Sequence, residues 1–257
     1  MQITFLGTCA GTEPMPTRHH TSFCIEEKGK IYWFDAGEGC SRTAHLLGID
    51  LLSISNIFIS HSHMDHIGGL ANLLYNIKKL SIRKDESPHF GKINLFLPDR
   101  DVQKGVEYLL KTTLQNYGTS LDIIPNDVTD GCLLDDDILK VTAFHNHHLK
   151  EHNFEPWRSF TYKIESSEKT VVYSGDVGDY KDLDEPLVCG CDALIVETGH
   201  LRIDGVYDYC KDKKIGKIFF NHSGREILND LPKAQKKVEE KFKGKAIICE
   251  DKMTMEI

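Results

Sequence analysis

The stretch NIFISHSHMDHIGGL, residues 56–70, decides how this chain folds and what it can bind. Three imidazoles and one carboxylate fall within six positions of it: His61, His63, Asp65 and His66. Each is costly to bury without a partner, and each is a good ligand for a divalent metal once deprotonated. A single histidine beside an apolar run is most often part of the packed interior, but three beside an aspartate are hard to explain by packing. The stretch therefore predicts part of a metal site.

The apolar residues of this stretch predict a strand that leads into a helix. The run NIFIS is typical of a buried strand, and apolar residues then return at intervals of three to four over positions 67–80. The four candidate ligands would lie at the turn between strand and helix, which presents them together. Two metals with open positions need about six or seven ligands, so the chain must return to this site elsewhere.

Three further apolar runs end in side chains that can bind a metal. KVTAFHNHHL ends in histidines, VVYSGDV ends in Asp176, and KIFFNHSGRE ends in His222. Individually, an aspartate after glycine is most often a turn residue, and a histidine at a strand end is most often structural. Jointly, four strand ends that offer imidazole or carboxylate predict one site. Within HNHH, His145, His147 and His148 remain alternatives.

The whole chain has the composition of one globular domain. It has 257 residues, 40% hydrophobic and 27% charged, with strand-like runs between segments of helical spacing at 100–114, 202–211 and 227–242. We expect a single mixed α/β domain over residues 1–257. The eight cysteines show no CxxC pair, the first residues lack a basic signal-peptide region, and no apolar run could span a bilayer. These features predict a cytoplasmic protein with reduced thiols.

The motif HxHxDH, followed by a histidine, SGD and a final histidine, resembles the metallo-β-lactamase superfamily. The segments FLGTCAGTEPMPTRHHTS and IYWFDAGEG are also similar to the opening of tRNase Z and related phosphodiesterases. The resemblance covers almost the full chain. It implies a hydrolase with an αββα four-layer sandwich of two mixed β-sheets flanked by helices, with the site along the edge of the facing sheets.

The resemblance also implies two divalent metal ions with Asp176 as the bridge between them. The first ion would bind His61, His63 and the later histidine. The second ion would bind Asp65, His66 and His222. The family's spacing from Val141 favours His148 as the later histidine, with His147 as the fallback. Ligands of this kind suit zinc, although manganese or iron is also compatible with them.

Asp35, in FDAGEG, matches the aspartate that in this superfamily holds a ligand histidine from behind and fixes its ring. Two metal ions can bind a water as hydroxide at neutral pH and neutralise developing charge on a phosphate or carbonyl oxygen. The resemblance implies that Asp65 orients this hydroxide or accepts its proton. It also implies that Glu197 and His200, in ETGH, assist proton transfer to the leaving group, although a capping or loop role explains these two equally well.

Ser223 and Arg225, in HSGRE, follow the last ligand as a serine and an arginine do in the tRNase Z pattern HFSxRY. An arginine beside two metals suits a phosphate diester, whereas an arginine in a surface ion pair is the structural alternative. Arg18 and Thr21, in PTRHHTS, occupy a loop that lines the substrate groove in the same branch. These residues favour a phosphodiester over a carbonyl substrate.

Bacterial tRNase Z carries a long arm that grips tRNA, inserted between the third metal-ligand motif and the bridging aspartate. Only the 27 residues 149–175 separate His148 from Asp176 here, so that arm has no room. Together with a net charge of −8, this favours small, cyclic or unstructured phosphodiesters over tRNA. A thioester or lactone hydrolase of the same superfamily is the alternative enzyme, and a non-catalytic metal-binding module is the alternative outside enzymes. The sequence leaves the oligomeric state open, a homodimer included.

Overall fold

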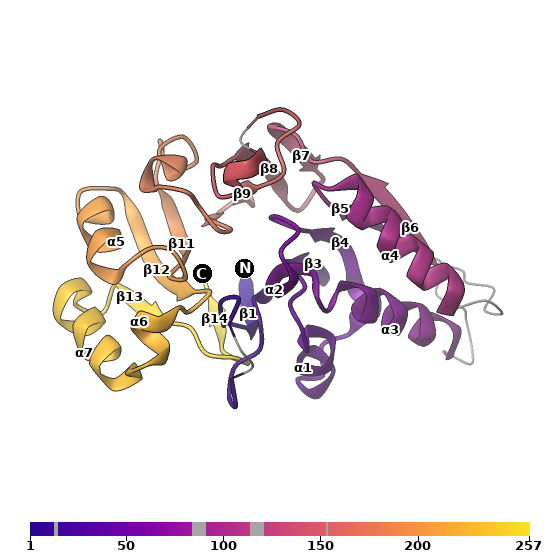
Figure 1. Ribbon diagram of the computed structural model, residues 1–257, viewed down its shortest axis with the longest axis horizontal. Coiled ribbons are helices and arrows are strands. Elements are labelled where there is room, and N and C mark those ends of the chain that lie inside the picture. Colours follow the sequence, from indigo (N-terminus) through magenta and orange to yellow (C-terminus); the bar gives the residue numbers. More distant parts are fainter. Residues whose placement is uncertain (13–14, 84–90, 114–120, 153) are drawn as a thin grey trace.

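The computed structural model describes residues 1–12, 15–83, 91–113, 121–152 and 154–257. Two seven-stranded sheets face each other at its centre (Figure 1). The first sheet contains β1 (Gln2–Gly7), β2 (Ser22–Glu27), β3 (Lys30–Phe34), β4 (Ile54–Phe58), β5 (Gly91–Phe96), β6 (Leu121–Asn126) and β14 (Thr254–Glu256). The second contains β7 (Gly131–Asp135), β8 (Lys140–His145), β9 (Phe160–Glu165), β10 (Thr170–Tyr173), β11 (Cys191–Glu197), β12 (Ile215–Asn221) and β13 (Ala246–Ile248).

Both sheets are mixed, and both follow the same plan. The strand orders are β14-β1-β2-β3-β4-β5-β6 and β7-β8-β9-β10-β11-β12-β13. In each order the first three neighbouring pairs are antiparallel and the last three are parallel. The two halves of the chain therefore share one architecture, although the sequence shows no internal repeat.

The core between the sheets follows from the alternation of side chains along each strand. In β3, Tyr32 and Phe34 face the opposite sheet, whereas Ile31 and Trp33 face the helices on the outside. Stacked phenylalanine rings continue this inner layer across the first sheet, with Phe34 and Phe58 centred 5.1 Å apart. Because both faces of these central strands are buried, they read as continuous apolar runs in the sequence.

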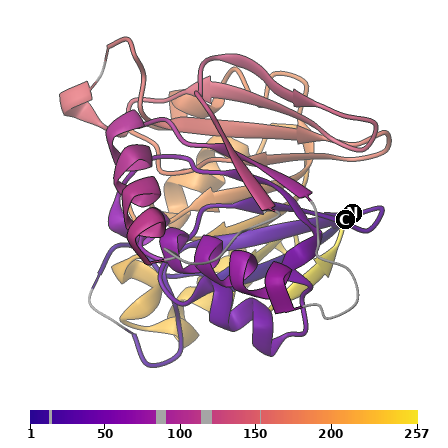
Figure 2. The ribbon, with the colours of Figure 1, turned by 90° about the vertical axis from the view of Figure 1, so that its right-hand side faces the viewer.

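Helices cover the outer face of each sheet (Figures 1 and 2). Buried residues of α1 (Cys40–Leu46), α3 (Leu70–Arg83) and α4 (Arg100–Thr113) pack on the first sheet. Those of α5 (Ile203–Cys210) and α7 (Leu231–Phe242) pack on the second. The shorter elements are α2 (Met64–Ile67), α6 (Arg225–Leu228), η1 (Leu51–Ser53), η2 (Lys150–His152) and η3 (Tyr180–Leu183). This arrangement confirms the predicted αββα sandwich.

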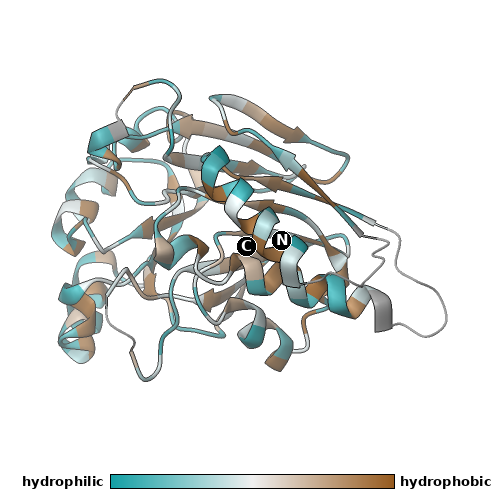
Figure 3. Ribbon diagram, turned by 45° about the vertical axis from the view of Figure 1, so that its right-hand side comes forward, coloured by the Kyte–Doolittle hydropathy of each residue, from teal (hydrophilic) through white to brown (hydrophobic). Residues whose placement is uncertain are grey.

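The covering helices carry both hydrophilic and hydrophobic residues along their length (Figure 3). None of the helices in the described part of the chain is both long enough and apolar enough to cross a membrane.

Two predicted helices are each divided in the structure. The helix expected over 67–80 is broken at Gly68 and Gly69, between α2 and α3. A Cβ atom on Gly69 would lie 2.3 Å from the carbonyl oxygen of Gly37, so only glycine lets the chain pass this close. The helix expected over 227–242 is broken before Asp230, whose side chain accepts a hydrogen bond from the backbone N–H of Lys233 and caps α7.

Candidate metal centre

The predicted ligands lie on loops that follow four strands: β4, β8, β10 and β12. The loop after β4 is short, and it ends in the single helical turn α2, which begins at Met64. His63 occupies the position before that turn, while Asp65 and His66 lie within it. The tight turn explains how one stretch of six residues directs four side chains into one place.

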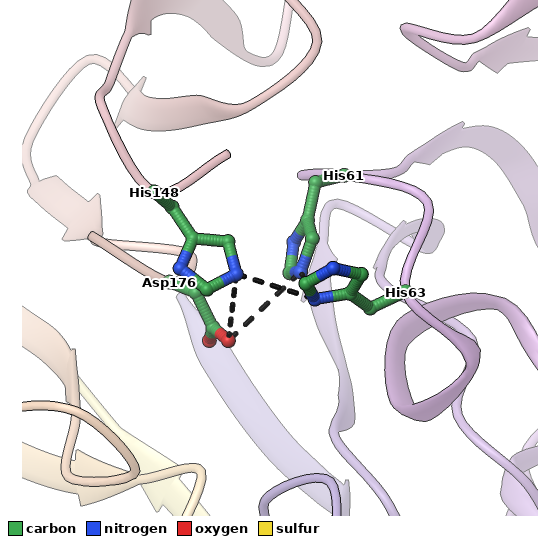
Figure 4. A group of neighbouring side chains, drawn as sticks. All are labelled: His61, His63, His148 and Asp176. Carbon is green, nitrogen blue, oxygen red and sulfur yellow. Dashed lines mark hydrogen bonds and ion pairs between the residues drawn. The ribbon is translucent and has the colours of Figure 1, made fainter. Parts of the chain in front are cut away.

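The first ligand group consists of His61, His63, His148 and Asp176, whose ligand atoms all lie within 4.8 Å of one another (Figure 4). His63 Nδ1 lies 3.0 Å from His61 Nε2 and 3.2 Å from His148 Nε2. Asp176 Oδ2 closes the group, at 3.7 Å from His148 Nε2 and 3.9 Å from His61 Nε2. Three imidazole nitrogens and one carboxylate oxygen therefore converge on one point.

The second ligand group consists of Asp65, His66, Asp176 and His222, again within 4.8 Å. His222 Nε2 lies 3.0 Å from Asp65 Oδ2 and 3.3 Å from Asp176 Oδ1. His66 Nε2 lies 3.5 Å from Asp65 Oδ2 and 3.4 Å from Asp176 Oδ1. Asp176 thus belongs to both groups, with one oxygen facing each.

The side chains in these groups are of the kind that bind divalent metals, and two of their buried atoms lack a hydrogen-bond partner. His66 Nε2 and Asp176 Oδ1 are buried and make no hydrogen bond. Burying such atoms unpartnered is costly, and a coordinated ion would satisfy both. Imidazole and carboxylate together fit zinc or a neighbouring divalent metal.

The electrostatics of the groups suit metal ligation. Burial lowers the pKa of His148 to about 4 and holds the pKa of His61 well below its ordinary value, so both imidazoles are neutral at neutral pH. Burial alone would raise the pKa of Asp176, but His222 and His66 hold it well below its usual range. Burial opposes protonation of His222, but Asp176 and a hydrogen bond to Asp65 raise its pKa to about 9. A metal ion would displace that proton.

The structure separates the three histidines of HNHH. Only His148 of the three reaches the first ligand group. His145 Nδ1 instead lies 2.6 Å from Asp130 Oδ2, and its ring stacks on Trp157. His147 Nδ1 lies 2.5 Å from Asp182 Oδ1. The structure therefore places His148, and neither His145 nor His147, beside His61, His63 and Asp176.

Asp35 lies behind the second group, next to His66. It is fully buried, with a positive φ of 51° at the end of β3, and its Oδ2 lies 2.6 Å from His66 Nδ1. Ser60 donates to it from both its backbone N–H and its hydroxyl, at 2.6 Å and 2.7 Å. Tyr173 donates its hydroxyl at 2.5 Å from the opposite sheet. Sequence analysis missed Ser60 and Tyr173, although each directly flanks a ligand motif.

Of the two predicted proton-transfer residues, the structure brings only His200 to the open side of the centre. His200 lines the cavity, and its Nε2 lies 3.2 Å from Asp176 Oδ2. Glu197 is 1% exposed and lies behind His222, with Oε2 at 3.9 Å from His222 Nδ1. It accepts a hydrogen bond from the backbone N–H of His200 at 2.7 Å. Of the two roles predicted for Glu197, proton transfer or capping, this buried position favours the second.

Of the three predicted substrate-binding residues, only Arg225 lines the cavity. Arg225 lines the cavity and donates to the Thr12 hydroxyl at 3.1 Å. Ser223 is fully buried and joins the chain to the loop after β1 through its backbone. Arg18 is 9% exposed and donates to the Thr8 hydroxyl and the Cys249 carbonyl, both at 2.6 Å. Contrary to the prediction, Arg18 therefore holds the C-terminal segment rather than lining the substrate groove.

Thr21, predicted beside Arg18, is likewise fully buried, and its hydroxyl donates to the Cys9 carbonyl at 3.1 Å.

The cavity over the metal centre measures about 410 Å³. Its lining includes His63, Asp65, Asp176 and His222, together with the Ala10–Thr12 segment that sequence analysis did not single out. A second hollow of about 550 Å³ shares His63 and adds His148 and Arg158. His63 therefore adjoins both cavities.

Comparison with known proteins agrees with this geometry. The sequence matches the family described as Anti-Pycsar protein Apyc1 over residues 1–196. The chain belongs to this family. It is also 32% identical over 143 residues to the Ribonuclease Z of Methanothermobacter thermautotrophicus, a match that covers 56% of this chain and 43% of that protein. The Apyc1-family chain spans about half or less of the length of such curated relatives.

Solved structures resemble this Apyc1-family protein over its whole length. The short form of human tRNase Z superposes with a TM-score of 0.70 at 21% identity, covering 100% of this chain and 99% of that one. The metallo-β-lactamase fold protein YhfI from Bacillus subtilis superposes with a TM-score of 0.72 at 19% identity, covering 99% and 98%. The protein therefore has the metallo-β-lactamase fold that its motifs predicted.

Proposed function

We propose that this protein is a phosphodiesterase that holds two divalent ions, zinc in the first instance and manganese or iron as alternatives, in its two ligand groups. The observation that carries the proposal is the position of Asp176. Its Oδ2 lies 3.7 Å from His148 Nε2, and its Oδ1 lies 3.3 Å from His222 Nε2. A carboxylate whose two oxygens face two separate ligand groups is placed to bridge a pair of ions.

The two ions, when bound, would lower the pKa of a coordinated water and neutralise charge that develops on the phosphate. The chain's own part begins with Asp65, which lines the cavity. Burial alone would raise its pKa, but His222 and His66 hold it well below the usual range. At the edge of the cavity this carboxylate can orient the attacking water as a hydrogen-bond acceptor or accept its proton.

His200 is the group that we assign to the leaving oxygen. Its side chain is 50% exposed at the cavity, and the hydrogen bond to Asp176 raises its pKa above the ordinary value. A protonated ring at this exposed position can donate a proton to a departing alkoxide. Glu197 supports this role by holding the backbone N–H of His200 at 2.7 Å.

Arg225 favours a phosphorus centre over a carbonyl. Its guanidinium lines the cavity beside the two ligand groups and donates to Thr12 at its edge. A planar guanidinium matches the oxygens of a phosphate, whereas an acyl substrate brings no such charge. The relative named Ribonuclease Z supports the same class of substrate. These observations rank a thioester or lactone hydrolase second.

The substrates that we propose are small or unstructured diesters, cyclic or linear, rather than tRNA. Between His148 and Asp176 the described residues 149–152 and 154–175 form η2, β9, β10 and their connections, without an inserted arm. The net charge of −8 also opposes a long polyanion, whose binding depends on many cationic contacts. Cleavage of a small ester depends mainly on the metal centre and is affected less.

A substrate panel on metal-reconstituted protein tests this function. We expect hydrolysis of bis-p-nitrophenyl phosphate that requires the metal and falls sharply in Asp65→Ala, and the panel adds cyclic nucleotides, unprocessed tRNA, a glutathione thioester and a lactone. Efficient, correctly placed cleavage of a pre-tRNA trailer would refute the choice of small substrates. Thioester or lactone hydrolysis without any phosphodiester hydrolysis would favour the alternative enzyme, and no turnover of any compound would favour a binding module.

A further inference from the structure

Asp182, in η3, is a buried carboxylate that the proposed reaction does not use. Its side chain is 4% exposed. Its Oδ1 lies 2.5 Å from His147 Nδ1. Its Oδ2 accepts backbone N–H groups from His147 at 3.2 Å, Gly178 at 2.8 Å and Asp179 at 3.2 Å. A buried carboxylate is retained only when its oxygens are satisfied, and here four donors satisfy them.

These four donors belong to two loops of the metal centre. His147 directly precedes His148, and Gly178 follows Asp176 by two positions. The two loops also touch, because a Cβ atom on Gly178 would lie 2.6 Å from the His147 carbonyl oxygen. One carboxylate thus ties the loop that carries His148 to the loop that carries Asp176.

Chain connectivity alone does little to hold these two ligands in position relative to each other. His61 and His63 are two residues apart on one loop, so chain connectivity restrains them. Between His148 and Asp176 lie the 27 residues 149–175, and neither of these two ligands lies in a strand. Small displacements of either loop would change the distance of 3.7 Å between His148 Nε2 and Asp176 Oδ2.

We propose that Asp182 is a positioning residue that sets the geometry, and hence the ion affinity, of the group His61, His63, His148 and Asp176. The inference rests on the proposed function, since it supposes an ion in that group. Residues that orient metal ligands in this way typically change metal affinity about 10–100-fold when they are removed. Asp182 does so through backbone and ring contacts on both loops, without contacting the ion.

The chain supplies a matched control in Asp130. Asp130 holds His145 as Asp182 holds His147, accepting from the backbone N–H at 2.6 Å and pairing with ring Nδ1 at 2.6 Å. Its side chain is 48% exposed, and these contacts do not extend to the loop of Asp176. Removing Asp130 therefore deletes the same chemistry from the same strand end without loosening the two ligand loops.

The experiment compares Asp182→Ala, Asp182→Asn and Asp130→Ala with the wild type as full-length, zinc- or cobalt-loaded proteins. Ion affinity is measured by chelator competition, ion content by elemental analysis, and the sites are distinguished by cobalt absorption spectra. We expect Asp182→Ala to bind the ion of the first group about 10–100-fold more weakly than the wild type does. Its affinity for the ion of the second group should fall less. Asp182→Asn, which keeps the volume and one acceptor, should lose less, and Asp130→Ala should match the wild type.

Wild-type affinity for both ions in Asp182→Ala, with only a lower melting temperature, would overturn the proposal and leave Asp182 a purely structural residue. An equal loss in Asp130→Ala would also overturn it. If Asp182→Ala fails to fold, as judged by circular dichroism, the graded comparison of Asp182→Asn with Asp130→Asn carries the test. Failure of the proposed function would be recognised separately, because the wild type itself would then bind fewer than two ions or hydrolyse no diester.

Discussion

The two halves of the metal centre reach the same geometry by different means. In the first half, four side chains come from the single stretch 61–66, whose spacing and short helix α2 hold them together. In the second half, His148, Asp176 and His222 come from three loops separated by residues 149–175 and 177–221. A buried carboxylate, Asp35, also supports His66 in the first half. In the second half, Asp182 at the first two loops and Glu197 behind the third support segments that are far apart in the chain. We therefore expect the second half to be more sensitive to substitutions outside the ligands.

The largest effect should come from Asp176→Ala, which removes the one ligand common to both groups. In the proposed two-ion centre a shared carboxylate serves both ions, so we expect ion content to fall from two per chain toward zero and diester hydrolysis to fall to background with it. Elemental analysis and hydrolysis of bis-p-nitrophenyl phosphate measure this. Asp184→Ala, which alters an ion pair with Lys213 on a neighbouring turn, is the control and should keep both ions. An Asp176→Ala protein that still binds two ions would remove the basis for a bridge.

The next largest effect should distinguish His148, which lies in the first ligand group, from His145, which does not. His148→Ala should lose the ion of the first group, so that content falls from two ions to one. His145→Ala should retain both, because its ring pairs with Asp130 and stacks on Trp157 outside either group. The same elemental analysis decides the matter. If His145→Ala lost an ion and His148→Ala kept both, His145 rather than His148 would be the ligand of the first group.

A smaller effect should follow from removing a contact that supports the first half, the hydrogen bond from Tyr173 to Asp35. Tyr173→Phe deletes the hydroxyl that lies 2.5 Å from Asp35 Oδ2, and Asp35 in turn holds His66. We expect the second ligand group to bind its ion about tenfold more weakly. Chelator competition measures this affinity, and chemical denaturation should show a stability loss of about 1–2 kcal/mol.

Tyr162→Phe is the matched control for that change. Tyr162 is also fully buried in the second sheet, but its hydroxyl donates to the Ile59 carbonyl at 2.6 Å rather than to Asp35. Its loss should destabilise the fold by a similar amount and leave ion affinity unchanged. If Tyr173→Phe and Tyr162→Phe bind the ion with equal affinity, the Tyr173 hydroxyl contributes to stability and not to ion binding.

The smallest effect should concern substrate rather than metal. Arg225→Ala should raise KM about tenfold with little change in kcat, because a charged hydrogen bond of about 1.5 kcal/mol would be lost from ground and transition states alike. Steady-state kinetics with a small diester measure this. Arg100→Ala, which breaks a surface pair with Asp127 away from the cavity, should leave KM unchanged. A fall in kcat without a change in KM would instead show that Arg225 contacts the phosphate only in the transition state.

The sequence by itself determined the features that depend on local spacing. The motif at 61–66 predicted four ligands because residues this close in the chain cannot be far apart in space. Strand-like runs that end in Asp176 and His222 predicted two more, because functional side chains gather where strands end. Helix boundaries were less certain, since Gly68 and Gly69 and the cap at Asp230 divide segments whose apolar spacing is continuous.

Only the tertiary structure decided which polar residues face the cavity and which support it. His145, His147 and His148 have equivalent chemistry, and the partners Asp130 and Asp182 that distinguish them lie on other loops. Arg18 resembles a substrate-binding residue in sequence, but the C-terminal segment that buries it is more than 200 positions away, at Cys249. The physical reason is the same in each case. A charged or polar side chain takes its role from the partners that satisfy it once water is excluded, and packing between distant segments selects those partners.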